Sequence, residues 1–334
     1  MSRFARRLGL FGLVTLALSA CGPRGSKTKT PDGGGATAAI DPKDRPAIFA
    51  ASDLPETLDK PLADDPMQVT IHRLSNGMTV YFSVDREKPR YVGWVGVRAG
   101  SRHDPADSTG LAHYLEHMLF KGSDEYGTLD AAAEAAHVER VRELYVELRK
   151  VGDDKAARER IFGEIDRETQ AIAATAVPNE LDRMYSAMGV EGVNAFTSDE
   201  QTVYIGEVPA NRMEAWATTE VERFADPVFR LFYPELEAVY EEKNLSLDDP
   251  ENRVWEVMMK GLLPDHPYGA QTTIGESAHL KSPAYQDMVD FFERWYVPNN
   301  MAIVLAGDVD PKIALPLLER TFGQLEPKPV PTEL

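Results

Sequence analysis

The segment 110–120 constrains the fold more than any other part of the chain. It places two histidines and a glutamate on a helix that is otherwise apolar. The apolar residues of this helix are Leu111, Ala112, Leu115, Met118, Leu119 and Phe120. A helix that is apolar on nearly all sides is buried, and buried polar groups without partners are costly. The fold must therefore bring other polar groups, or a metal ion, to His113, Glu116 and His117.

His113 and His117 have the spacing that binds one metal ion. Residues i and i+4 lie on one face of a helix, so both imidazole rings can reach the same ion. Zinc in hydrolytic sites keeps three protein ligands and a water, whose pKa falls toward about 7. Glu116 lies in the same turn, where a carboxylate can take the proton of that water during attack on a peptide carbonyl. The pattern predicts zinc-dependent peptide hydrolysis. The alternative, two solvent-exposed histidines beside a glutamate, conflicts with the apolar surroundings.

The run 110–123, Gly-Leu-Ala-His-Tyr-Leu-Glu-His-Met-Leu-Phe-Lys-Gly-Ser, closely resembles the active-site helix of the pitrilysin family. This family holds the zinc peptidases with an inverted motif, among them insulysin and the mitochondrial processing peptidases. The resemblance covers about residues 68–325. Further segments that carry it are 192–197, 296–301 and 307–308. It implies His113 and His117 as zinc ligands, Glu116 as general base, and a distal glutamate as third ligand.

Several glutamates between residues 234 and 242 are candidates for the third ligand. On a helix with about 100° per residue, Glu235 and Glu242 share one face with the small Ala238 between them, whereas Glu241 points away. The family pattern places its ligand seven residues after another glutamate, as Glu242 follows Glu235. We therefore expect Glu242 to bind the metal and Glu235 to orient a histidine or the substrate. Glu241 remains the alternative ligand.

The resemblance also implies a peptide-binding strand, formed by Asn194, Ala195, Phe196 and Thr197. A substrate would add there as a further strand, so that backbone hydrogen bonds recognise extended shape more than side-chain identity. Ordinary sheet and turn roles for Asn194 and Thr197 are the alternative.

The charge balance excludes one class of partner. The chain has 54 Asp and Glu residues against 36 Lys and Arg residues, a net charge of −18. A nucleic-acid phosphate backbone requires a basic face, so nucleic acid is not the expected partner. The acidic excess is either a solvated surface or an acidic cleft that favours basic and neutral peptides.

The N-terminal residues predict export. Three arginines within residues 1–7, an apolar run at 8–18 and two small residues before Cys21 are typical of a signal peptide. The apolar run is too short for a stable membrane span. Leu18-Ser19-Ala20-Cys21 resembles a bacterial lipobox, which implies cleavage before Cys21 and its lipidation. We expect a lipid anchor in a bacterial membrane, at the outer membrane or periplasmic face. A cleaved signal with a chance cysteine is the alternative.

The remaining chain divides by composition into a tether and one domain. Residues 1–20 are the expected signal peptide. Residues 21–66 are rich in Gly, Pro, Thr and Asp and lack apolar periodicity, which is typical of a flexible tether. Periodic apolar residues begin near Gln68, so we predict a single peptidase domain over residues 67–334. Cys21 is the only cysteine, which excludes an intrachain disulfide.

The domain is expected to alternate strands and helices. Asn76-Gly77 between two alternating runs predicts a β-hairpin. Further strands are expected at 91–97, 192–197, 202–206 and 301–306. Helices are expected at 110–120, capped by Asp107-Ser108-Thr109, and at 209–225, 234–248, 283–295 and 311–322. This pattern predicts an α+β fold, a two-layer sandwich with a mainly antiparallel sheet and helices packed on it.

A helical hairpin is expected as an insert at about residues 124–178. Its helices span 129–151 and 155–175, joined by a turn at 152–154. The insert either packs on the surface or gates a cleft. It also explains why the stretch between His117 and Glu242 is longer than is usual for the family.

Peptidases of this family pair two homologous domains around the substrate, and this sequence contains one. A second homologous domain or chain is therefore an expected partner, and the expected activity is cleavage of peptides or unfolded segments in the cell envelope. The alternative function is that of a non-catalytic zinc-binding partner or scaffold subunit in a two-chain peptidase.

Overall fold

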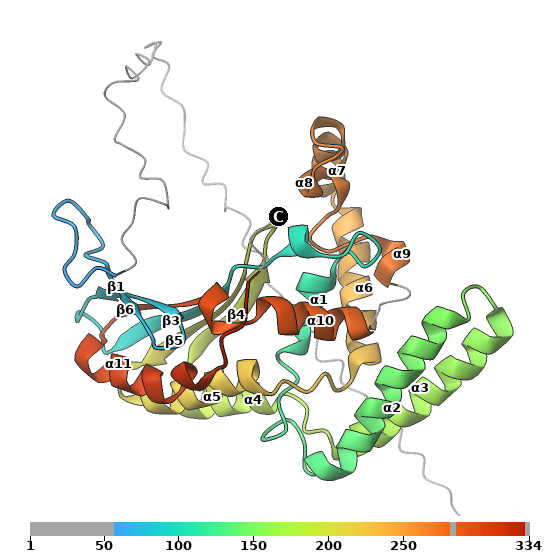
Figure 1. The fold of residues 1–334 in the computed structure, drawn as a ribbon, viewed down its shortest axis with the longest axis horizontal. Helices are drawn as coiled ribbons and strands as arrows, with labels where there is room; N and C mark the ends of the chain where they lie inside the picture. Colours follow the sequence, from blue (N-terminus) through green and yellow to red (C-terminus); the bar gives the residue numbers. More distant parts are fainter. Residues whose placement is uncertain (1–56, 281–284, 331–334) are drawn as a thin grey trace, which may run out of the picture. The chain divides into compact units, whose positions relative to one another are not determined.

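A six-stranded sheet forms the centre of the structure, a computed structural model that describes residues 57–280 and 285–330. The strands follow the order β1-β2-β6-β3-β5-β4 (Figure 1). They are β1 (Thr70–Arg73), β2 (Thr79–Val84), β3 (Arg90–Val97), β4 (Glu191–Thr197), β5 (Thr202–Pro209) and β6 (Met301–Gly307). Neighbouring strands are antiparallel except β2 and β6, which are parallel. The predicted α+β fold with a mainly antiparallel sheet is confirmed.

Helices cover one face of this sheet. The helices are α1 (Leu111–Met118), α2 (Ala131–Lys150), α3 (Lys155–Thr175), α4 (Glu180–Met188), α5 (Met213–Ala225), α6 (Phe232–Asp248), α7 (Pro250–Leu262), α8 (Pro267–Ala270), α9 (Ser277–Leu280), α10 (Tyr285–Trp295) and α11 (Pro311–Arg320). α5 and α11 lie along the sheet (Figure 1). Trp216 of α5 packs so closely on β3 that a Cβ at Gly93 would lie 2.9 Å from its ring. On the other face Trp94 is 38% exposed, so the sandwich has two layers.

The first hairpin forms around Asn76-Gly77 as predicted, with β1 paired to β2. Pairing with the sheet begins earlier in the chain than expected. Leu58 forms an antiparallel bridge with Ile71 of β1. The last residues of the predicted tether thus contact the sheet. The predicted signal peptide 1–20 and most of the tether lie outside the described residues. Within the described ranges, no helix is long and apolar enough to cross a membrane.

The cap of α1 differs from the prediction. Asp107, Ser108 and Thr109 do not cap the helix. Instead, Asp104 accepts hydrogen bonds from the backbone N–H groups of Gly110 and Ala112, both at 2.8 Å. Gly110 has a φ of 84°, and a Cβ there would lie 2.7 Å from the Ile274 carbonyl oxygen. This left-handed turn lets a carboxylate from the preceding loop reach the helix terminus.

Replacement of Asp104 by alanine is expected to destabilise the protein. Asp104 is 8% exposed, so its loss leaves two buried N–H groups without an acceptor. Losses of caps and of buried hydrogen bonds predict a cost of about 2–3 kcal/mol. Urea unfolding measures this cost. The matched control is Asp107→Ala, in the same loop, where the carboxylate contacts Arg149 on the surface and stability should change little. Equal stability of both variants would contradict the assigned cap.

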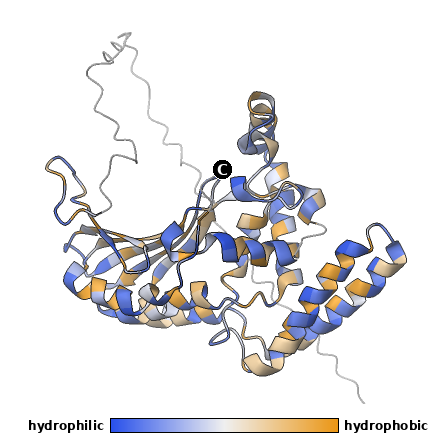
Figure 2. Ribbon diagram, in the orientation of Figure 1, coloured by the Kyte–Doolittle hydropathy of each residue, from blue (hydrophilic) through white to orange (hydrophobic). Residues whose placement is uncertain are grey.

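The predicted helical hairpin is formed by α2 and α3. Figure 2 shows apolar and polar positions alternating along both helices. The apolar stripes pack together: Val141, Leu144, Tyr145 and Leu148 are buried in α2, and Ile161, Ile165 and Ile172 in α3. Arg149 pairs with Asp287 of α10 at 3.0 Å, and the ring of Tyr145 lies 5.0 Å from that of Phe232 in α6. The insert is therefore packed against helices of the domain.

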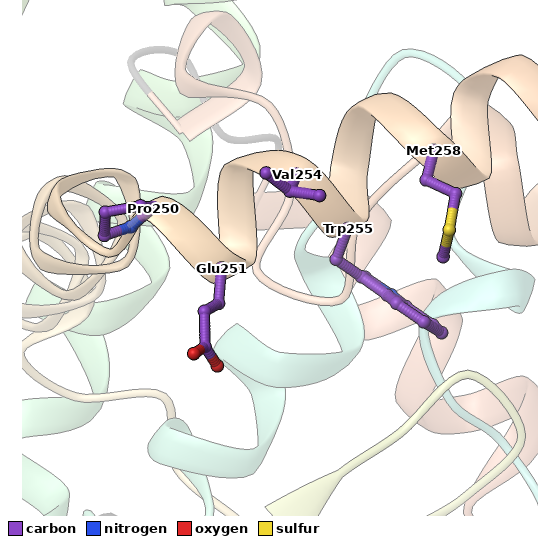
Figure 3. A pocket seen from close by; sticks show the side chains of 5 residues that line it. All are labelled: Pro250, Glu251, Val254, Trp255 and Met258. Carbon is purple, nitrogen blue, oxygen red and sulfur yellow. The ribbon is translucent and has the colours of Figure 1, made fainter.

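Four helices were not predicted: α4, α7 and the four-residue helices α8 and α9. α7 contributes none of its residues to the buried core. Its apolar side chains include Val254 at 68% and Trp255 at 60% exposure. Figure 3 shows the shallow groove that these residues line together with Pro250, Glu251 and Met258. An ion pair of 3.0 Å between Glu256 of α7 and Lys243 connects the helix to α6.

Candidate metal centre

Two helices far apart in the sequence, α1 and α6, build the site (Figure 1). The hydroxyl of Tyr114 in α1 donates a hydrogen bond to the carbonyl oxygen of Phe232 in α6, and their rings lie 4.8 Å apart. Leu115 of α1 and Val239 of α6 are fully buried in the core. Apolar packing thus fixes the two helices, so the polar side chains that they carry are held in place.

Three side chains converge on one point. The Nε2 atoms of His113 and His117 lie 3.3 Å apart. Oε2 of Glu242 lies 3.6 Å from the His113 nitrogen and 3.4 Å from the His117 nitrogen. Residues 113, 117 and 242 are the group of possible metal ligands found within the described ranges. The structure thus brings together the three residues that were expected to bind metal.

This triangle fits zinc. Ligand atoms about 2.0–2.1 Å from a tetrahedral zinc ion lie about 3.3–3.4 Å from one another, close to the three measured separations. Two imidazoles and one carboxylate are also the ligand set of several catalytic zinc sites. Two imidazole nitrogens and a carboxylate oxygen that face one another at these distances are stabilised by a positive charge between them.

Polar groups around the triangle orient its members. Oε1 of Glu235 lies 2.9 Å from Nδ1 of His117, so that Nε2 of this ring is directed to the metal position. The other oxygen of Glu235 pairs with the ammonium of Lys121. Glu235, which was expected to orient a histidine or the substrate, thus contacts a histidine. Lys121 was missed, because it lies beyond the end of α1 at Met118, where helix periodicity no longer indicates which way a side chain points. Nδ1 of His113 is buried and has no hydrogen-bond partner among the described residues.

The two histidines differ in their electrostatic surroundings. Burial, together with the neighbouring His117, lowers the pKa of His113 to about 4. Burial alone would lower the pKa of His117, but its hydrogen bonds with Glu235 and Glu242 raise that pKa to about 9. His113 is therefore a neutral ligand at neutral pH, and the position between the rings and Glu242 attracts positive charge.

Glu116 lies beside the triangle on the side of the sheet. It is 7% exposed, and its Oε2 accepts a hydrogen bond of 2.5 Å from the hydroxyl of Thr197. Burial raises the pKa of Glu116, while the Thr197 hydrogen bond opposes this shift. A carboxylate with a raised pKa next to a metal position is suited to receive and return a proton.

The other predicted site residues have these positions. Asn194, Ala195, Phe196 and Thr197 lie on β4, which is an edge strand of the sheet, and Phe196 is 38% exposed. Glu241 is exposed and does not join the metal-binding group. Cys21 lies outside the described residues.

Comparisons of the sequence with known proteins give matches to zinc peptidases. Residues 80–138 match the family described as insulinase, peptidase family M16, and residues 284–334 match the peptidase M16 inactive domain. The probable zinc protease PqqL of Haemophilus influenzae is 25% identical over 265 residues, which are 76% of this chain and 23% of that protein.

Solved structures share the fold. A protease from Helicobacter pylori has a TM-score of 0.60 at 20% identity, over 79% of this chain and 52% of that chain. Pitrilysin has a TM-score of 0.59 at 23% identity, over 84% of this chain and 25% of that chain. The chain thus spans about a quarter to a half of the length of these proteins.

Proposed function

Because this chain belongs to the pitrilysin-like M16 family of peptidases, we propose that it is the zinc-binding part of an endopeptidase. The observation that carries the proposal is the convergence of His113, His117 and Glu242, with the buried carboxylate of Glu116 beside them. Three ligands leave a fourth zinc position for water, the arrangement of catalytic rather than structural zinc sites.

Each residue of the site has a proposed role in metal binding or proton transfer. His113, His117 and Glu242 would hold the ion, and Glu235 would keep the His117 ring in its orientation. When bound, zinc supplies the Lewis acidity that lowers the pKa of water and polarises a peptide carbonyl. Glu116 then accepts a proton from the attacking water and returns it to the leaving amine.

The proposed substrate is an extended peptide or unfolded segment. β4 is an edge strand that lies next to α1, so a peptide paired with residues 194–197 would run beside Glu116. Such pairing uses backbone hydrogen bonds and accepts varied side chains.

We further propose that a second homologous domain or chain completes the cleft. Support comes from the greater length of the proteins that this chain matches. Export and a lipid anchor at Cys21 would place the enzyme in the cell envelope, and the signal-like N-terminal sequence supports this part of the proposal.

Metal removal tests the proposed function. We expect the purified protein to contain zinc in near-stoichiometric amount at neutral pH. Supplied with the completing half, it should cleave an unstructured peptide, lose this activity after treatment with a chelator and regain it when zinc is added. Absence of zinc would overturn the proposed metal centre. Bound zinc without cleavage, with the second half present, would instead identify a non-catalytic subunit.

A further inference from the structure

The side chain of Thr197 has a contact that a substrate-binding strand does not require. Thr197 is the last residue of β4, and its hydroxyl donates a hydrogen bond of 2.5 Å to Oε2 of Glu116, across 81 positions of sequence. Among the described residues, this is the one side-chain hydrogen bond that Glu116 accepts. The base and the edge strand are therefore directly connected.

The surroundings of Thr197 direct its single proton to Glu116. The nearest other hydroxyl is that of Thr202, at 3.4 Å, in the β5 position that pairs with Thr197. Thr202 is fully buried and donates its own proton to the carbonyl oxygen of Ala99 at 3.0 Å. A threonine hydroxyl has one proton, and the β-branched side chain has few rotamers in a strand. The Thr202 oxygen could still accept this proton, but its 3.4 Å separation is much longer than the 2.5 Å hydrogen bond to Glu116.

We infer that Thr197 is a positioning residue for the general base, an inference that rests on the proposed function. Its hydroxyl holds one oxygen of the Glu116 carboxylate, so that Oε1 is directed to the attacking water. The side chain thus orients the base, while the backbone of the same residue remains in the strand proposed to pair with substrate. The strand proposed to pair with the peptide is therefore also the strand that orients the base.

The experiment compares Thr197→Val with Thr197→Ser. Valine keeps the shape of threonine and removes the hydroxyl, whereas serine keeps the hydroxyl. With the completing half and zinc present, we expect the valine variant to lower kcat by about 10- to 100-fold, as for other groups that orient catalytic residues. Its KM and zinc content should match those of the wild type, and the serine variant should recover most of the wild-type kcat. A crystal structure of the valine variant should show the Glu116 carboxylate in more than one rotamer.

The control is Thr70→Val in β1, at the opposite edge of the same sheet, where kcat should not change. An unchanged kcat in Thr197→Val would overturn the inference, as would an equal fall in the serine variant or a change confined to KM. If the valine variant does not fold, Thr197→Ala is compared with the serine variant by the same criteria. Failure of the wild type to bind zinc or cleave peptide is a separate result, because it rejects the proposed function before any variant is measured.

Discussion

The variant Glu116→Gln is expected to bind zinc as the wild type does and to lose nearly all peptide hydrolysis. Glutamine has the shape of glutamate and can still accept the hydrogen bond from Thr197, but it cannot take a proton from water at neutral pH. General-base catalysis contributes about 10²–10⁴-fold to the rate, so kcat should fall by that factor. Measurements of kcat and of zinc content by elemental analysis test the two halves of the prediction.

The control for Glu116→Gln is a change at a buried glutamate outside the metal centre. Glu134 is 2% exposed and pairs with Arg230 at 2.7 Å, so Glu134→Gln tests the removal of a buried carboxylate charge elsewhere in the domain. That variant should lose stability and retain kcat in its folded fraction. Full turnover by Glu116→Gln would exclude Glu116 as the base, and loss of its zinc would indicate a ligand role instead.

The short-range features of the site were predictable from helix geometry alone. His113 and His117 share a face because they are four residues apart, and Glu235 and Glu242 share one because they are two turns apart. In the structure both pairs meet, with His117 contacting Glu235 and Glu242. Local periodicity therefore indicated which side chains face inward, before the arrangement of the helices was known.

Contacts made through loops and between strands were not predictable in this way. Asp104 reaches the start of α1 because the left-handed Gly110 turns the loop back, whereas the sequence favoured the adjacent residues 107–109 as the cap. The hydrogen bond between Thr197 and Glu116 depends on the register of β4 against β5 and on the position of α1 beside them. Such contacts follow from tertiary packing, which short sequence patterns do not encode.

α7 shows a second limit of sequence patterns. Its apolar residues favour burial, yet the helix leaves Val254 and Trp255 largely exposed. A pattern identifies an apolar face but not the surface that covers it. The surface that covers such a face is hardest to identify when, as here, the chain matches only part of the length of its relatives.

Replacement of Glu242 by alanine is expected to weaken zinc binding far more than replacement of its neighbour Glu241. Glu242 supplies the third corner of the triangle, whereas Glu241 is exposed and outside the group. Loss of a group that only orients a ligand costs about 10- to 100-fold in metal affinity, so loss of a ligand should cost more than about 100-fold.

Competition with a chromophoric chelator measures both dissociation constants, and Glu241→Ala is a matched control because it removes the same charge one residue away on the same helix. Its zinc affinity should stay close to that of the wild type, since exposed charges are screened by solvent. If Glu241→Ala were the weaker binder, α6 would have to be rotated by about 100° from its position here, because adjacent helix residues differ by that angle. That rotation would also move Glu235 away from His117. The zinc affinities of the two variants therefore test both which glutamate binds the metal and how α6 packs against α1.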